Sequence, residues 1–112
     1  MKIMYSIEKR IEISASHFLK LDYDSKCENM HGHNWIIYIS CKNENLDENG
    51  MVVDFSIIKK MLIEKMDHKN LNEIFDFNPT AENIAKYIVD NIPDCYKAKV
   101  QESEGNVATY EI

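Results

Sequence analysis

Three of the four histidines in this 112-residue chain stand in two short segments. His31 and His33 are separated by one glycine, and residues at i and i+2 of a strand point to the same side, so both imidazoles can face one point. His17 ends the first predicted strand and can supply a third nitrogen. Three neutral imidazoles with one open position are typical of catalytic zinc, although a His-x-His pair alone also occurs on surfaces without metal.

Cys27 lies in a polar loop, four residues before His31. A loop cysteine near a dication ionises readily, and its thiolate can act as a base or a nucleophile. Cys27 can instead be a fourth metal ligand, which would make the site structural. Cys41 and Cys95 are predicted to be small buried hydrophobic residues. Three cysteines without a C-x-x-C pair indicate a reducing compartment rather than a disulfide framework.

Two further sets of polar residues can take part in chemistry. Asp67 directly precedes His68, and a carboxylate beside an imidazole can orient it as a proton shuttle. The alternative is an exposed pair at the end of a helix, where the dipole favours a protonated histidine. Glu102 alternates with Ala98 and Val100 and is expected to point inward with them, where it can bind an aminopyrimidine edge by two hydrogen bonds. It can equally lie in water at the end of its strand.

Alternating apolar and β-branched residues predict the strands that carry these groups. The first covers residues 3–14, with a bulge expected near Glu8–Arg10, and the second covers residues 34–42. Two short strands are predicted in the tail, on either side of a turn at Glu104–Asn106. The histidines therefore fall at the ends of strands.

Helical spacing of apolar residues predicts two helices in the middle of the chain. Asp54 is the expected N-cap of the first; Pro79 and Thr80 open the second, which Pro93 ends. The order strand-strand-helix-helix-strand-strand predicts an α+β fold, with a four-stranded antiparallel sheet and two helices on one face. Length and the absence of a linker predict a single domain over residues 1–112.

Composition excludes two classes of partner. The net charge of −6 repels a phosphate backbone, so we expect no nucleic-acid binding. No apolar run is long enough to span a bilayer, and the first residues do not resemble a signal peptide. We therefore expect a cytoplasmic protein that does not enter membranes.

Six motifs, in order, resemble those of the 6-pyruvoyl-tetrahydropterin synthase family. They are Ser14–Phe18, Cys27-x-x-x-His31-Gly32-His33-Asn34, Gly50–Phe55, Asp67–Asn72, Pro79–Asn83, and Val100–Glu102 with Ala108–Tyr110. The resemblance implies the tunnelling fold, in which subunits assemble into β-barrels, commonly as homohexamers, with active sites between subunits. It also implies a role for each candidate residue: zinc at His17, His31 and His33, Cys27 as general base, Asp67 and His68 in proton transfer, Glu102 as pterin anchor, and Thr80 lining the same pocket.

The three-residue gap between Cys27 and His31 resembles the branch that makes 6-carboxy-tetrahydropterin for queuosine. This lyase converts 7,8-dihydroneopterin triphosphate to 6-carboxy-5,6,7,8-tetrahydropterin, acetaldehyde and triphosphate. The 6-pyruvoyl branch has a longer gap, and the folate branch, which makes 6-hydroxymethyl-dihydropterin, uses a glutamate as its base. Glu28 beside Cys27 leaves that product open. A zinc hydrolase and a non-catalytic zinc- or pterin-binding module are more distant alternatives.

Overall fold

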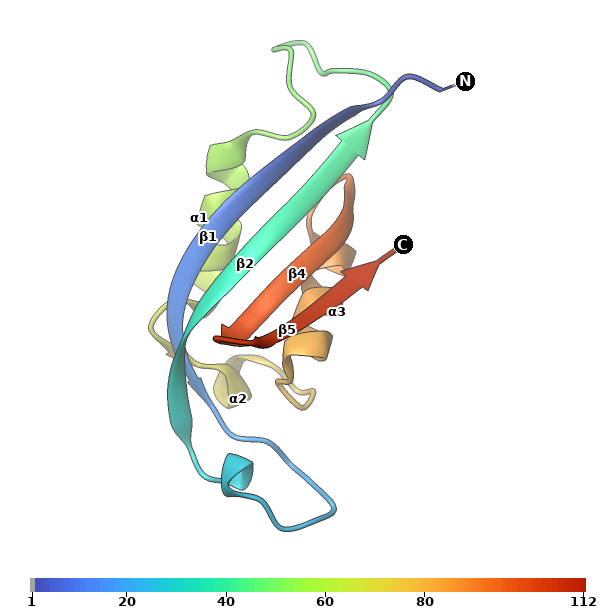
Figure 1. Cartoon of the computed structure of the whole chain (residues 1–112). Coiled ribbons are helices and arrows are strands. Elements are labelled where there is room, and N and C mark those ends of the chain that lie inside the picture. Colours follow the sequence, from blue (N-terminus) through green and yellow to red (C-terminus); the bar gives the residue numbers. More distant parts are fainter. Residues whose placement is uncertain (1) are drawn as a thin grey trace.

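A computed structural model of the protein, which describes residues 2–112, contains a five-stranded sheet with its helices on one face (Figure 1). The strands are β1 (Tyr5–His17), β2 (His31–Asn43), β3 (Lys69–Asn70), β4 (Cys95–Ser103) and β5 (Asn106–Glu111). The helices are a 3₁₀ turn η1 (Lys26–Glu28), α1 (Phe55–Met66), α2 (Leu71–Ile74) and α3 (Ala81–Asn91). The strand order across the sheet is β3-β1-β2-β4-β5.

A long hairpin of β1 and β2 dominates the sheet. The antiparallel register runs without a shift from Tyr5 opposite Asn43 to His17 opposite His31. Strand β4 pairs with β2 only from Ile36 onward. The end of the hairpin that carries the histidines therefore projects beyond β4, as Figure 1 shows.

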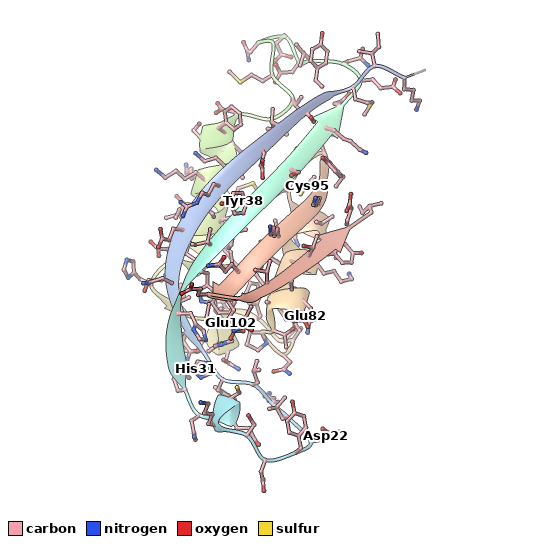
Figure 2. All side chains as sticks on the ribbon, in the orientation of Figure 1. Asp22, His31, Tyr38, Glu82, Cys95 and Glu102 are labelled. Carbon is pink, nitrogen blue, oxygen red and sulfur yellow. The ribbon has the colours of Figure 1, made fainter. Side chains whose placement is uncertain are left out.

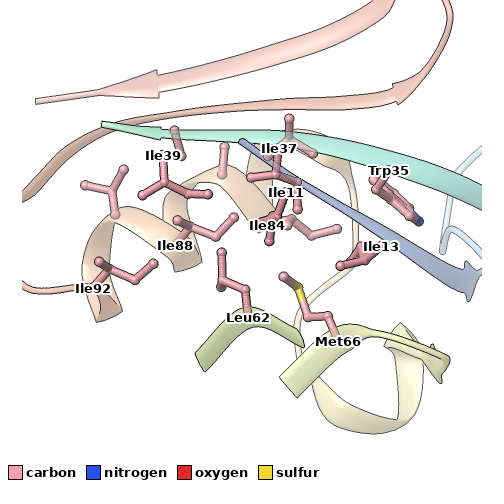
Figure 3. Packing of buried hydrophobic residues seen from close by; sticks show 14 of the residues in the cluster. Ile11, Ile13, Trp35, Ile37, Ile39, Leu62, Met66, Ile84, Ile88 and Ile92 are labelled. Atoms are coloured by element: carbon pink, nitrogen blue, oxygen red, sulfur yellow. The ribbon is translucent and has the colours of Figure 1, made fainter. Parts of the chain in front are cut away.

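The core lies between the sheet and the helices (Figure 3). Alternation along β2 turns Trp35, Ile37 and Ile39 toward the helices, where all three are completely buried. On the helix side, Leu62 of α1 and Ile88 of α3 pack against them at helical spacing. This packing fixes the two strands from which the hairpin extends.

Both long helices begin at the predicted caps. Asp54 accepts a hydrogen bond from the Ser56 amide at 2.8 Å, and Thr80 accepts one from the Asn83 amide at 3.1 Å. Helix α3 ends at Asn91, shortly before Pro93. Within residues 2–112, none of the helices combines the length and apolar content that crossing a bilayer requires.

The α+β architecture with helices on one face is confirmed, but two details of the predicted sheet are wrong. A fifth strand, β3, pairs in parallel with Ala15 and Ser16, which makes the sheet mixed, and the short helix α2 follows it directly. Two residues are too few to show a periodicity, so the sequence pattern could not reveal β3.

The bulge expected near Glu8–Arg10 is also absent from the β1–β2 ladder. Lys9 occupies an inward position and is half-buried, whereas its neighbours Glu8 and Arg10 are exposed. A lysine can lie inward near a strand end because its methylene stem packs while its ammonium reaches water. Lys9 therefore interrupts the alternation of apolar and polar residues along β1, while the β1–β2 pairing continues without a bulge.

Candidate metal centre

The three strand histidines face the helix side of the sheet at the projecting end of the hairpin. His17 lies opposite His31, and Ala15 lies opposite His33, in the β1–β2 register. Because side chains alternate, the histidines share the face of Ala15 and Trp35. Strand β4 ends beside them and contributes Glu102, which Figure 2 shows near His31.

His17, His31 and His33 form what we call the histidine cluster. Together with Glu102 they make one compact group of four side chains, the metal-binding group. One ligand atom from each lies within 4.8 Å of every other. The centroid of the His17 ring lies 4.6 Å from that of His31 and 5.2 Å from that of His33, and those of His31 and His33 are 4.8 Å apart. Imidazole nitrogens and a carboxylate are ligands that zinc accepts.

Two backbone carbonyls fix the tautomers of the cluster. Nδ1 of His17 lies 2.8 Å from the Pro79 carbonyl oxygen, and Nδ1 of His31 lies 2.7 Å from that of Asn29. A carbonyl oxygen only accepts, so each Nδ1 carries the proton and donates it. Each Nε2 then holds a free lone pair, which is how a ligating histidine is normally oriented.

Unpaired buried nitrogens show that the cluster fits a cation. Nε2 of His17 and Nε2 of His33 are both buried without a hydrogen-bond partner. The nearest carboxylate oxygen, Oε1 of Glu102, lies 3.3 Å from Nε2 of His33. Buried polar atoms seldom stay unpaired in proteins, and a metal ion would satisfy both nitrogens at once. The group of His17, His31, His33 and Glu102 could therefore bind a metal.

Burial also favours the ligating form of these rings. Desolvation lowers the pKa of His17 below the ordinary 6.5, and the Pro79 hydrogen bond and Glu102 offset this only in part. Desolvation likewise lowers the pKa of His33, against the opposing effect of Glu102. Both rings are thus neutral near pH 7, as metal binding requires.

These lowered pKa values predict an acid-sensitive apoprotein. Because the folded-state pKa lies below 6.5, the unfolded chain binds protons first as the pH falls. The stability contribution is fully present above about pH 6.5 and is lost as the pH falls through the lowered values. Urea unfolding should give a smaller free energy of unfolding at about pH 5 than at about pH 7.5. His33→Gln should reduce this difference and His68→Ala should not; equal differences in both variants would contradict the assignment.

The cluster lies over Trp35, the only tryptophan in the chain. The rings of His17 and His33 meet it edge to face, with centroids 4.9 Å and 5.5 Å away. Trp35 is completely buried, and its Nε1 donates to the Ala15 carbonyl at 3.2 Å. Its fluorescence is therefore a direct reporter of changes at the cluster.

Comparison with known proteins identifies the family. The family model described as 6-pyruvoyl tetrahydropterin synthase matches residues 6–112. The chain belongs to this family. The match includes every candidate site residue.

Two similar relatives carry different activities in their names. The 6-carboxy-5,6,7,8-tetrahydropterin synthase of Bacillus subtilis is 31% identical, over 95% of this chain and 84% of its own length. The human 6-pyruvoyl tetrahydrobiopterin synthase is 32% identical, over 94% of this chain and 90% of its own length. The solved 6-pyruvoyl tetrahydropterin synthase of Caenorhabditis elegans superposes with a TM-score of 0.77 at 27% identity, covering 98% of this chain and 96% of that one.

Cys27 is only four residues before His31 in the sequence, but its side chain is not part of the metal-binding group. Cys27 lies half-buried in η1, which Ser25 caps by accepting from the Cys27 amide at 3.2 Å. Its carbonyl accepts from the Leu19 amide at 2.8 Å, which joins the two ends of the loop. The fourth ligand atom in the group comes from Glu102, not from Cys27. This arrangement does not support Cys27 as a fourth ligand.

The Asp67–His68 pair lies at the edge of the sheet. Asp67 accepts from the Ser14 amide at 2.9 Å, and the His68 amide donates to the Ser14 carbonyl at 2.7 Å. Nε2 of His68 lies 3.6 Å from Oδ2 of Asp67, and the imidazole is 82% exposed. His68 lines a hollow of about 430 Å³ with Ser14, Ser16 and Asn34, and the same hollow also touches His33. Neither Asp67 nor His68 belongs to the metal-binding group. The fold of this chain therefore does not bring the pair into the cluster.

Glu102 and the start of α3 do share a hollow. Its volume is about 290 Å³, and it is lined by Ala81, Glu82, Glu102 and the β4–β5 turn. Thr80 caps the same helix end. The inward direction predicted for Glu102 is confirmed, since it reaches His33.

A larger residue would fit at Gly32, between His31 and His33. A Cβ added there would meet only the Ala15 backbone oxygen, at 3.9 Å.

Two asparagines that no sequence pattern singles out hold the loop after His17. Asn72 accepts from the Phe18 amide at 2.8 Å and donates to the Phe18 carbonyl at 2.9 Å. Asn78 binds the amide and the carbonyl of Lys20 in the same way, at 2.9 Å and 3.1 Å. Asn72 belongs to one of the quoted motifs, but no pattern indicated its role. These side chains position His17 and the loop that carries Cys27.

Alanine at Asn72 should loosen the cluster as well as the fold. The Phe18 amide and carbonyl would lose their partner, which costs about 1–3 kcal/mol of stability. The displaced His17 should weaken metal binding roughly tenfold or more, as the loss of an orienting partner does. Urea unfolding and a metal titration followed by Trp35 fluorescence measure the two effects. The matched control is Asn91→Ala, because Asn91 donates only to Tyr87 within α3. Equal metal affinity in both variants would refute a positioning role.

Proposed function

We propose that this protein is a zinc-dependent 6-carboxy-5,6,7,8-tetrahydropterin synthase that acts in the cytoplasm, in the queuosine pathway. It would convert 7,8-dihydroneopterin triphosphate and one molecule of water to 6-carboxy-5,6,7,8-tetrahydropterin, acetaldehyde and triphosphate. The observation that carries the proposal is the histidine cluster, with two buried and unpaired Nε2 atoms. The Bacillus subtilis relative of that name supports the choice of reaction.

His17, His31 and His33 would hold the zinc ion through their free Nε2 atoms, since Nδ1 of His17 and of His31 is engaged elsewhere. Bound zinc supplies Lewis-acid polarisation of the substrate's side-chain oxygens, which acidifies the neighbouring carbon atoms. Glu102 lies close enough to complete the group while the site holds no substrate. We propose that its carboxylate turns to the pterin when substrate binds.

The pterin would occupy the hollow between the start of α3 and the β4–β5 turn. Glu102 accepts there from the amino group and ring nitrogen of the aminopyrimidine, as a carboxylate does in paired hydrogen bonds. Thr80 would line the same pocket from the helix cap. The hollow lies beside the cluster because Glu102 belongs to both. A pterin bound in this hollow would have its side chain next to the metal ligands.

Proton transfer would fall to Cys27 and to the Asp67–His68 pair. The Cys27 thiolate takes a proton from the substrate side chain, and His68 returns one at another position. Asp67 holds His68, while the Ser14 amide holds Asp67. Since this pair lies at the sheet edge, away from the cluster of its own subunit, we propose that it serves the cluster of a neighbouring subunit in a homohexamer.

Product analysis tests the proposal. Zinc-loaded protein is incubated with 7,8-dihydroneopterin triphosphate, and the products are identified by mass spectrometry. Release of 6-carboxy-tetrahydropterin, acetaldehyde and triphosphate is the expected result. If protein with bound zinc gives no turnover, the proposed activity is wrong and a binding module is favoured.

A second product is kept open by the human relative and by Glu28. The human relative is named for 6-pyruvoyl tetrahydrobiopterin synthesis. Glu28, the alternative base, is exposed in η1, whereas Cys27 is half-buried, which favours Cys27. Formation of 6-pyruvoyl-tetrahydropterin would move the chain to that branch. Formation of 6-hydroxymethyl-dihydropterin, lost in Glu28→Gln, would assign the base to Glu28.

A further inference from the structure

The proposed function leaves two cysteines without a role, and the fold places them against each other. Cys41 near the end of β2 lies directly opposite Cys95 at the start of β4. A register shift between Ser40 and Cys41 brings the two into this pairing. Figure 2 shows Cys95 toward the opposite end of the sheet from His31. The pair is therefore separate from the histidine cluster.

The spacing of such a pair is close to that of a disulfide. Directly opposed residues of an antiparallel ladder have Cβ atoms about 4.5–5.5 Å apart, and a disulfide needs about 3.5–4.5 Å. Both thiols are free, Cys41 is completely buried, and Cys95 is 7% exposed. The Cys95 thiol also lies 3.5 Å from the Lys97 carbonyl oxygen. A small movement would join the two sulfur atoms.

The adjacent turn holds the two strands in this register. Asp94 has a left-handed backbone, with φ of 59°, and its carbonyl accepts from the Lys42 amide at 3.0 Å. Its carboxylate accepts from the side chain of Asn43 at 3.2 Å. Both bonds tie the residues after Cys41 to the residue before Cys95. The two thiols therefore stay opposed while the protein is folded.

The contact between the thiols makes them chemically unequal. A hydrogen bond with Cys95, together with burial, raises the pKa of Cys41. The same hydrogen bond lowers the pKa of Cys95, with further help from the backbone at Lys97 and Ser40, although burial opposes it. The first proton therefore leaves Cys95, which is also the more exposed of the two. Thiolate character and exposure are what make a cysteine reactive to oxidants.

We propose that Cys41 and Cys95 form a redox-active dithiol that closes to an intramolecular disulfide when a peroxide is present. The Cys95 thiolate attacks the peroxide, takes one oxygen as a sulfenic acid and releases an alcohol or water. The Cys41 thiol then attacks the Cys95 sulfur, forms the S–S bond and releases water. The two electrons that the thiols lose reduce the O–O bond. A small-molecule dithiol reverses the reaction by exchange.

Closure should stabilise the protein strongly, because the bond joins residues on either side of a segment that contains α1 and α3. A disulfide lowers the conformational entropy of the unfolded chain, and this stabilising effect grows with the length of the loop that the bond closes. For a domain of this size, the melting temperature should rise on the order of 10 °C on oxidation. The rise should disappear when reductant is added.

The test uses the 112-residue chain with Cys27→Ser. It is treated with a slight excess of hydrogen peroxide and then denatured and alkylated. Trypsin cuts after Lys26, Lys42, Lys86 and Lys97, so Cys41 and Cys95 fall in separate peptides. Residue 27 shares a peptide with Cys41, and its substitution therefore makes the linkage unambiguous. The expected results are a cross-linked pair of peptides, loss of two hydrogen atoms from the intact mass, and the rise in melting temperature.

The comparison variants are Cys41→Ser and Cys95→Ala in the same background, which should form no link and show no thermal shift. If both thiols still react with the alkylating agent after the peroxide treatment, the proposal is wrong. So would sulfinic acid at Cys95 without any cross-linked peptide. The search for the cross-linked peptides is made on protein that keeps both Cys41 and Cys95. A comparison variant that folds poorly therefore does not weaken that result. The outcome is also independent of turnover, because residue 27 is serine throughout.

Discussion

Alanine in place of His31 is expected to remove tight metal binding and, with it, turnover. His31 supplies one of three imidazoles in the cluster, and its Nδ1 is held by the Asn29 carbonyl so that Nε2 is free. Losing an orienting partner weakens metal affinity about 10- to 100-fold, and losing a ligand should cost on the order of 100-fold or more. Turnover should fall roughly 1,000-fold, since a metal supplies several kcal/mol to the transition state.

His31 is the best histidine to remove, because it is only half-buried. His17 is completely buried and hydrogen bonded to Pro79, so its loss would confuse stability with metal binding. Metal content after gel filtration and titration of Trp35 fluorescence with zinc are the two measurements. His68→Ala is the matched control, since the His68 imidazole is 82% exposed and lies outside the cluster.

The control separates the two roles proposed for histidine. His68→Ala should keep full zinc content and wild-type fluorescence titration, yet lose turnover through the missing proton transfer. A His31→Ala protein that binds zinc as tightly as the wild type would place the metal elsewhere. Equal loss of zinc in both variants would indicate a general effect on the fold, which urea unfolding would detect.

The positions of the histidines could be predicted because strand periodicity is a local property. Alternation along β2 is enough to turn His31 and His33 to one face, and the same rule places Ala98, Val100 and Glu102 together on β4. The caps at Asp54 and Thr80 were equally predictable, since a side chain bonds the backbone two or three residues later. The family resemblance added the roles, which local patterns do not contain.

Contacts between distant segments could not be predicted from local patterns. Strand β3 exists because the backbone of Lys69 and Asn70 meets β1, more than fifty positions earlier in the chain. The Pro79 carbonyl that orients His17 leaves no trace in residue types, because every residue has a carbonyl. The Cys41–Cys95 pairing also depends on a register shift that only the assembled sheet reveals. The features that the sequence did not predict are therefore mostly backbone contacts between residues far apart in the chain.

Replacing Cys27 by alanine is expected to abolish turnover while leaving zinc binding unchanged. Cys27 lies in η1 at the end of the loop that leads to His31, but it is not one of the side chains of the metal-binding group. Loss of a general base lowers the rate roughly 100- to 10,000-fold. Steady-state turnover of 7,8-dihydroneopterin triphosphate and zinc content, measured on the same preparation, give the two numbers.

Cys27→Ser and Glu28→Gln decide what the thiol contributes. A serine keeps the Ser25-capped turn but is a far weaker acid, so it should be as slow as alanine if a thiolate is the base. Glu28→Gln should keep wild-type turnover and product, because that carboxylate is exposed in η1. Zinc lost from Cys27→Ala would make Cys27 a ligand and the site structural. Full turnover in Cys27→Ala, with loss in Glu28→Gln, would transfer the base to Glu28 and predict 6-hydroxymethyl-dihydropterin as the product.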